Sequence, residues 1–235
     1  MRVYVDRPVA VVTGGNRGVG REICRQLALL GYGVVLCSRD LRKGELAAKE
    51  LDPEGERIVA CQLEVDNTLS VEAMAEWVKG RFGRTDVLVN NASTPFDRWA
   101  TASNADLGTV AEALDVNLFG AWRVIHVLLP MLRASTRPRI VNVSSEGGSI
   151  AVMTGGSPAY GVSKAGLNAL TRLLAAELAR DGILVNAVCP GWVADEAHPS
   201  GRTMAQAAAS VIWAVTLPNG GPTGTFTRDG QPYPW

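Results

Sequence analysis

A tyrosine and a lysine stand four residues apart, at Tyr160 and Lys164. Ser157 is a residue type favoured at helix N-caps, and Pro158 suits a first helical position, so a helix is predicted to begin here. The spacing then places both side chains on one helix face, one turn apart. An ammonium beside a phenol favours the ionised phenol, so we expect the pKa of Tyr160 to lie below its ordinary value of ~10. Such a tyrosine could exchange a proton with an alcohol or a carbonyl, although the same spacing also arises by chance on helix faces.

A glycine-rich segment follows the first predicted strand. Residues 9–12 form a short β-branched and apolar run, which is typical of a strand buried on both faces of a parallel sheet. The run leads into Gly14, Gly18 and Gly20, and a helical pattern follows. Glycine lets the backbone approach a phosphate, and a helix N-terminus offers N–H groups and the positive end of its dipole. With a second strand expected at 34–38, the segment predicts a dinucleotide site rather than an ordinary turn.

Strands and helices are predicted to alternate along the whole chain. Strands are expected near residues 9–13, 34–38, 57–63, 86–90, 139–144, 183–188 and 223–227. Helices are expected near residues 18–31, 41–51, 69–82, 104–134, 158–180 and 203–216. This order predicts an α/β fold, a doubly wound parallel sheet of about seven strands with helices on both faces. Ligands bind at the carboxyl ends of such strands, which is where Asn90, Ser145 and Pro190 fall.

Six motifs, in order, resemble those of the short-chain dehydrogenase/reductase family, from about residue 8 to the C-terminus. They are Thr13-Gly14-Gly15-Asn16-Arg17-Gly18-Val19-Gly20, Asn90-Asn91-Ala92, Asn117 in Val-Asn-Leu-Phe-Gly, the strand at 140–145 ending in Ser145, Tyr160 with Lys164, and Pro190-Gly191-Trp192-Val193. Within the family the chain looks most like the carbonyl reductases, because of its glycine loop, residues 34–40 and Cys189-Pro190-Gly191-Trp192-Val193. The resemblance implies that residues 1–235 form a single Rossmann-fold catalytic domain that binds NADP(H).

The resemblance also implies which residues contact the cofactor. They are Gly14, Asn16, Arg17, Gly18, Val19, Gly20, Arg39, Glu64, Val65, Asn91, Ala92, Tyr160, Lys164, Pro190, Gly191 and Val193. A site for NAD would place a carboxylate at the end of the second strand, but Ser38 stands there and Arg39 follows it. Charge-assisted bonds from Arg17 and Arg39 to a 2′-phosphate, worth roughly 1.5–3 kcal/mol each, would favour NADP(H). Asp40 could bond a 2′-hydroxyl instead if the loop turned differently, and Glu64 stands where the family has Asp.

The implied catalytic residues are Asn117, Ser145, Tyr160 and Lys164. Tyr160 would be the general acid, and Ser145, rather than Ser144, would hydrogen-bond the carbonyl oxygen. Lys164 would bond the nicotinamide ribose and lower the pKa of Tyr160. Asn117 would hold a proton-relaying water, or it could simply stabilise a bend in its helix.

The function that the resemblance implies is an NADPH-dependent carbonyl reductase or ketoreductase. It would transfer hydride to a ketone, an aldehyde or a quinone-type carbonyl and give an alcohol. The alternatives are an NAD(P)-dependent alcohol dehydrogenase that acts oxidatively, and a catalytically idle NADP-binding regulatory protein on the same fold.

Two departures from the family pattern affect the substrate side. Ser145 and Tyr160 are 15 residues apart, slightly more than usual, so the loop between them is expected to bulge over the site. Ala194 and Asp195 stand where the family usually has a Thr that meets the carboxamide of the nicotinamide. Substrate-contacting residues are expected on the loops that rim the pocket, and they are Phe96, Trp99, Met153 and Trp192. They would favour an apolar or aromatic substrate, unless they serve only to pack a lid onto the core.

The composition of the chain argues against several classes of partner and ligand. Lys and Arg number 23, as do Asp and Glu, so no overall field favours nucleic acid or an anionic membrane. The four cysteines form no Cys-x-x-Cys pair, so neither a disulfide framework nor a metal site is expected. No apolar stretch approaches a membrane span and the N-terminus lacks a signal-peptide core, so a cytoplasmic location is expected. By analogy with the family, a homodimer or homotetramer would form through the helices that carry Asn117 and Tyr160.

Overall fold

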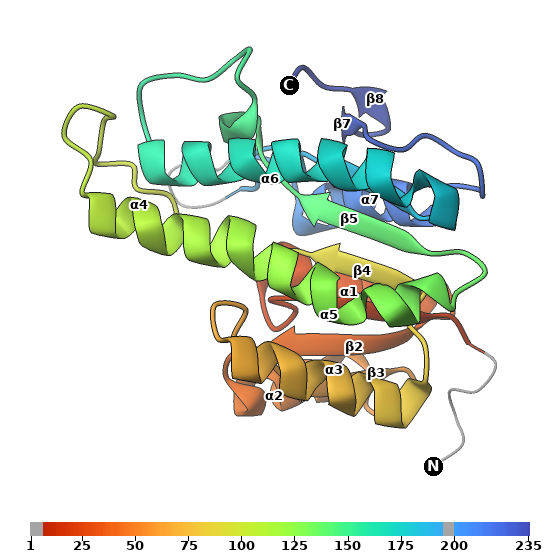
Figure 1. Ribbon diagram of the computed structural model, residues 1–235. Helices are drawn as coiled ribbons and strands as arrows, with labels where there is room; N and C mark the ends of the chain where they lie inside the picture. The colour runs from red at the N-terminus through yellow and green to blue at the C-terminus, as the bar shows by residue number, and fades with distance from the viewer. Residues whose placement is uncertain (1–6, 195–199) are drawn as a thin grey trace.

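The strands form one eight-stranded sheet in the order β3-β2-β1-β4-β5-β6-β7-β8 (Figure 1). This computed structural model describes residues 7–194 and 200–235. The strands are β1 (Val9–Val12), β2 (Gly33–Ser38), β3 (Ile58–Gln62), β4 (Val87–Asn90), β5 (Arg139–Val143), β6 (Leu184–Val188), β7 (Phe226–Arg228) and β8 (Gln231–Pro232). Neighbouring strands are parallel except at the edge, where β8 pairs antiparallel with β7. The predicted doubly wound α/β fold is confirmed, with one short edge strand more than expected.

The helices agree closely with their predicted ranges. They are α1 (Gly18–Leu29), α2 (Leu41–Leu51), α3 (Thr68–Phe82), α4 (Leu107–Leu114), α5 (Ala121–Arg133), α6 (Pro158–Leu178) and α7 (Met204–Thr216). The single helix expected at 104–134 is instead interrupted by a π-helical segment, Asp115–Gly120. Such a bulge re-aims side chains within a continuous helix, and this one contains Asn117.

Three helices pack against each face of the sheet. Val9 and Val11 of β1 join one core cluster, while Ala10 and Val12 join the other, because successive strand residues point to opposite faces. Helices α3, α5 and α6 supply the first cluster, and α1, α2 and α7 supply the second (Figure 1). None of the helices, so far as the chain is described, is long and apolar enough to cross a bilayer.

Four neighbouring strands bring the predicted motifs to one edge of the sheet. β1 lies between β2 and β4, so the chain reverses its direction of winding there, and such a switch point is where doubly wound sheets bind ligands. Going outward from β1, the next strands are β4, β5 and β6. The segments after their carboxyl ends therefore meet, although they are distant in sequence.

Candidate active site

The glycine-rich turn between β1 and α1 is tightly packed. Gly14 has a φ of +64°, a left-handed conformation that favours glycine. A Cβ on Gly20 would lie 2.3 Å from the carbonyl oxygen of Gly14 and 2.4 Å from Asn91 Nδ2. Asn91 Nδ2 in turn donates to the carbonyl oxygens of Thr13 (2.9 Å) and Gly14 (3.1 Å). Asn91 thus fastens the turn after β1 to the end of β4, while Gly20 lets α1 approach it.

The N-terminus of α1 is left open for an anion. Its N-cap is Arg17, whose side chain makes no capping hydrogen bond. Four other helices are capped by their own flanking side chains, which are Asp40 for α2, Asn67 for α3, Asp106 for α4 and Thr203 for α7. An uncapped, glycine-lined helix start presents N–H groups to a phosphate, so this turn fits the pyrophosphate of a dinucleotide.

Asp40, at the turn after β2, could bond a ribose 2′-hydroxyl or serve another role. Its carboxylate accepts from the backbone N–H of Lys43 at 3.2 Å, so it caps α2. Ser38 Oγ donates to the carbonyl oxygen of Asp40 at 2.8 Å, which fixes the turn. Arg17 and Arg39 are both exposed near this end of the sheet. One oxygen of the Asp40 carboxylate is therefore used to cap α2, and the two arginine side chains lie exposed beside it.

Tyr160 and Ser145 come together at the floor of the site. Tyr160 lies in the first turn of α6, and its buried side chain is hydrogen-bonded to those of Ser145 and Ser93. Ser145 lies just beyond the end of β5, after Ser144, and its Oγ also accepts from the N–H of Gly147 at 3.2 Å. The neighbouring Ser144 Oγ is buried with no hydrogen-bond partner among the described residues. The geometry thus pairs Ser145, and not Ser144, with the tyrosine.

Lys164 lies one turn after Tyr160 on α6, as its spacing predicts. Its Nζ lies 5.6 Å from the centroid of the Tyr160 ring and donates to the carbonyl oxygen of Val143 at 2.8 Å. Burial lowers the pKa of Lys164 to about 7, and burial raises the pKa of Tyr160 to about 12 against the opposing hydrogen bond from Ser145. The expected lowering of the Tyr160 pKa by Lys164 is therefore not found in this structure, because burial disfavours the phenolate and raises this pKa instead.

Asn117 is buried and fully engaged. Its Oδ1 accepts from the N–H of Thr94 at 2.9 Å. Its Nδ2 donates to Ser163 Oγ at 2.8 Å and to Thr94 Oγ1 at 3.2 Å. The side chain therefore joins the segment after β4 to α6, and this linking role is what the structure shows of the residue.

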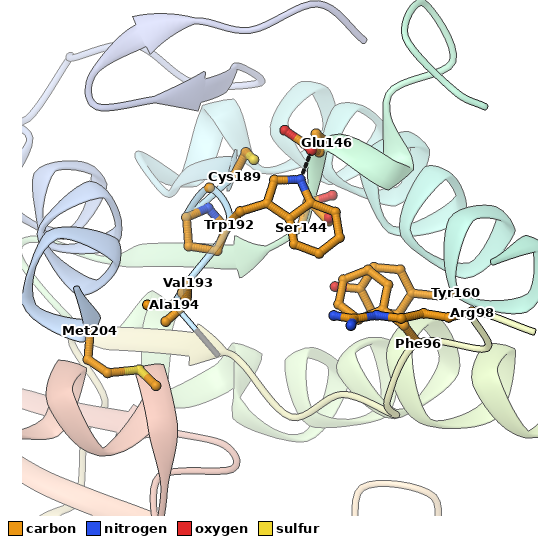
Figure 2. A pocket seen from close by; sticks show the side chains of 13 residues that line it. Phe96, Arg98, Ser144, Glu146, Tyr160, Cys189, Trp192, Val193, Ala194 and Met204 are labelled. Carbon is orange, nitrogen blue, oxygen red and sulfur yellow. Dashed lines mark hydrogen bonds between the residues drawn. The ribbon is translucent and has the colours of Figure 1, made fainter. Parts of the chain in front are cut away.

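Two adjoining cavities open beside Tyr160, with volumes of about 310 and 400 Å³. Both are lined by Phe96, Glu146, Tyr160 and Trp192. The smaller one, drawn in Figure 2, is further lined by Arg98, Ser144, Ser145, Cys189, Pro190, Gly191, Val193, Ala194 and Met204. The larger one is further lined by Gly147, Val152, Met153, Thr154, Gly156, Ser157, Gly161 and Tyr233. Between them, the cavities place apolar side chains around the Tyr160 phenol.

Aromatic rings form a stack over the tyrosine. The Phe96 ring lies 4.0 Å from that of Tyr160 and 5.4 Å from that of Trp192, measured between centroids. The Trp192 indole N–H donates to Glu146 Oε1 (Figure 2). Arg228 donates to Glu146 Oε2 at 2.6 Å. Glu146, which follows Ser145 in the chain, therefore fixes the position of the Trp192 indole.

The predicted substrate residues divide. Phe96 and Trp192 line both cavities, and Met153 lines the larger one. Trp99 is 79% exposed and lines neither, so its assignment to the pocket is wrong: its side chain points to solvent from the loop. Asp195 lies outside the described residues.

Several residues of the site were not predicted from the sequence, among them Ser93, Asp97, Glu146 and Arg228. Ser93 and Glu146 adjoin motifs that were identified, so their positions carried a signal. Asp97 and Arg228 act across long sequence separations, and no local pattern marks them.

Comparison with known proteins agrees with this geometry. A profile of the family described as short chain dehydrogenase matches residues 8–205. Carbonyl reductase (NADPH) 1 of Rattus norvegicus is 33% identical, over 98% of this chain and 99% of its own. The structure of salutaridine reductase from Papaver somniferum is 31% identical, with a TM-score of 0.81 over 94% of this chain and 99% of its own. A variant of actinorhodin polyketide ketoreductase, solved with NADPH, is 30% identical with a TM-score of 0.86 and covers 95% of each chain.

The family profile spans the chain from β1 to the start of α7, and the relatives cover nearly the whole chain. The chain belongs to the short-chain dehydrogenase family and is an oxidoreductase of that family.

Proposed function

We propose that this protein is an NADPH-dependent carbonyl reductase that converts a ketone, an aldehyde or a quinone-type carbonyl to an alcohol. The observation that carries the proposal is the Tyr160 phenol, which is hydrogen-bonded to Ser145 and lines both cavities beside Phe96 and Trp192. Residues 1–235 act as one NADP(H)-binding catalytic domain. The similarity to proteins named carbonyl reductase (NADPH) 1 and salutaridine reductase supports this proposal.

The residues around the glycine turn fit NADP(H). The open start of α1, at Gly18, Val19 and Gly20, would bind the pyrophosphate through backbone N–H groups. Arg17 and Arg39 would bind the 2′-phosphate, since Asp40 is engaged in capping α2. The remaining contacts come from the strand ends and from α6: Gly14, Asn16, Glu64, Val65, Asn91, Ala92, Tyr160, Lys164, Pro190, Gly191 and Val193.

NADPH, when bound, supplies the hydride that reaches the carbonyl carbon. Ser145 Oγ donates a hydrogen bond to the carbonyl oxygen and stabilises the negative charge that develops there. Tyr160 gives its phenolic proton to the same oxygen, which completes the alcohol. Lys164 would bind the cofactor ribose, and its ammonium, when protonated, would stabilise the phenolate that Tyr160 leaves after it gives up its proton. Phe96 and Trp192 cover the reacting groups and limit access of water.

The protonated form of Tyr160 is the form that carbonyl reduction uses as its proton donor. A phenol whose pKa is about 12 is protonated at neutral pH, so it can donate a proton at once. An alcohol dehydrogenase acting oxidatively needs the same group as a base, and therefore needs the phenolate. The intact Ser145, Tyr160 and Lys164 also argue against an idle regulatory protein.

The cavity walls favour an apolar or aromatic substrate. The rings of Phe96 and Trp192 and the side chains of Val152 and Met153 give the chamber apolar surfaces. Sites of this kind bind ligands mainly through such surfaces, with a few polar groups fixing orientation. Tyr160 and Glu146 are polar groups shared by both cavities, and Ser145 adds its hydroxyl to the smaller one. We place the reaction in the cytoplasm and expect a homodimer or homotetramer.

The test is the loss of nicotinamide absorbance with NADPH and with NADH, over a panel of aryl ketones, α-keto esters and quinones. Faster turnover with NADPH on at least one aryl ketone or quinone is the expected result. NADPH binding without turnover on any carbonyl would contradict the proposal and favour the regulatory alternative. Turnover only of alcohols with NADP⁺ would favour the oxidative one.

A further inference from the structure

The segment between β4 and α4 touches Tyr160 at three points. The Ser93 side chain is hydrogen-bonded to that of Tyr160, and the Phe96 ring lies 4.0 Å from the tyrosine ring. The third contact is made by the carboxylate of Asp97, which reaches the backbone of Tyr160 itself. One short segment thus contacts the hydroxyl, the ring and the main chain of the same residue.

Asp97 takes the place of an N-cap for α6. The residue is 4% exposed, and its two carboxylate oxygens accept from separate N–H groups, those of Ala159 (3.0 Å) and Tyr160 (3.2 Å). Ser157, at the N-cap position, has a φ of 52° and its side chain makes no capping bond. The expectation that Ser157 would cap the helix is therefore wrong, and a residue about sixty positions away does so.

The hydrogen bonds that start at Asp97 form a closed ring through the main chain of Tyr160. The carbonyl oxygen of Tyr160 accepts from Ser163 Oγ at 2.8 Å. Ser163 Oγ in turn accepts from Asn117 Nδ2, and Asn117 Oδ1 accepts from the N–H of Thr94. Thr94 is three residues before Asp97, so the ring returns to the segment where it began.

This ring fixes the peptide groups on both sides of the Tyr160 Cα. A capping side chain that only stabilised the helix would need no second connection to the same residue. Here the N–H is held by Asp97 and the C=O by Ser163, while Phe96 packs on the ring. The orientation of the phenol toward Ser145 therefore depends on the position of the Asp97 carboxylate.

We propose that Asp97 is a positioning residue for catalysis, which holds the Tyr160 phenol against Ser145 by fixing the start of α6 to the segment after β4. The inference rests on the function proposed above. Misplacing a reacting group by about 1 Å can cost on the order of a hundredfold in rate, so the effect belongs in kcat rather than in cofactor binding.

The experiment compares Asp97→Ala and Asp97→Asn with Asp52→Ala. Asp52 is a matched control, since its carboxylate also accepts from two backbone N–H groups, those of Arg57 (2.6 Å) and Ile58 (2.8 Å), away from both cavities. For each variant we would measure Tm, the Kd for NADPH, and kcat and KM for the best carbonyl of the panel. All kinetics are run at a temperature where every variant is folded.

Asp97→Ala is expected to lower kcat about tenfold or more, with the NADPH Kd and the KM for the carbonyl changed less than about threefold. Asp97→Asn should recover part of kcat, because its amide oxygen can still accept one of the two N–H groups. Asp52→Ala should lower Tm without lowering kcat. If Asp97→Ala does not fold, the comparison of Asp97→Asn with Asp52→Asn replaces it.

An Asp97 variant with the kcat of the Asp52 control would overturn the inference and leave the proposed function standing. A native protein that turns over no carbonyl would overturn the proposed function, and the inference with it. The native protein and Tyr160→Phe, assayed in parallel, distinguish these two outcomes.

Discussion

Tyr160 and Lys164 are both buried, and burial acts on their protonation in the same sense. It favours the neutral form of each, so the pKa of the phenol is raised to about 12 and that of the ammonium is lowered to about 7. A protonated phenol is the form needed to donate a proton to a carbonyl oxygen. A lysine whose pKa is about 7 gains or loses its charge with small changes of pH near neutrality.

The low pKa of Lys164 predicts a pH-dependent stability. The folded-state pKa of about 7 lies below the ordinary 10.5, so between these values the unfolded chain binds more protons than the folded one. The cost of the buried charge is present in full below pH 7 and is relieved as the pH rises through the window. The free energy of unfolding of the native protein, minus that of Lys164→Met, should therefore rise by about 1 kcal/mol between pH 7.5 and pH 8.5. Urea titrations at both pH values measure this, and a pH-independent difference would contradict the burial of Lys164.

At the scale of elements, the sequence predicted well what depends on local pattern. The start of α1 at Gly18 and both bounds of α2 were expected, because glycine turns and apolar periodicity mark them. The end of β4 at Asn90 was found for the same reason, whereas β5 ends at Val143 and Ser145 instead caps the short helical turn Glu146–Gly148. These elements bring the catalytic residues together once the sheet order is known.

Features set by tertiary contacts could not be predicted. The π-helical segment at Asn117 depends on partners in the segment after β4 and in α6. The cap of α6 comes from Asp97, whereas the local pattern favoured Ser157. The direction of Trp99 also depends on how its loop packs, and aromatic character alone suggested a pocket residue.

The packing of α1 against the glycine turn predicts opposite effects for two glycines. Gly20→Ala would place a methyl group 2.3 Å from a backbone oxygen, so it should destabilise the fold by roughly 1–3 kcal/mol and weaken NADPH binding. Gly80, inside α3, has open space around its Cβ position, so Gly80→Ala should stabilise by up to about 1 kcal/mol. Thermal unfolding with and without NADPH measures both. Equal Tm values for the two variants would mean that the close contact at Gly20 is wrong.

At the scale of the molecule, the helices that would join two copies carry exposed apolar side chains. Leu173 on α6 is 66% exposed, and Phe119 and Trp122 near the start of α5 are also exposed. Size-exclusion chromatography with light scattering should give a multiple of the 24.9 kDa chain mass, and Leu173→Glu should shift it toward the monomer. Leu46→Glu, at a leucine 62% exposed on α2, is the matched control and should not change the mass. A monomeric native protein, or equal behaviour of both variants, would contradict an interface on α6.

The most direct test of the proposed chemistry is the Tyr160→Phe variant, because it removes one oxygen and leaves the ring that packs against Phe96. General acid catalysis typically contributes 10²–10⁴-fold, so kcat for carbonyl reduction with NADPH should fall by at least about 100-fold. The NADPH Kd and the Tm should change far less than kcat, since the glycine turn is untouched and the buried ring is kept. A variant that binds NADPH and reduces the carbonyl at the native rate would contradict the assignment of Tyr160 as the proton donor.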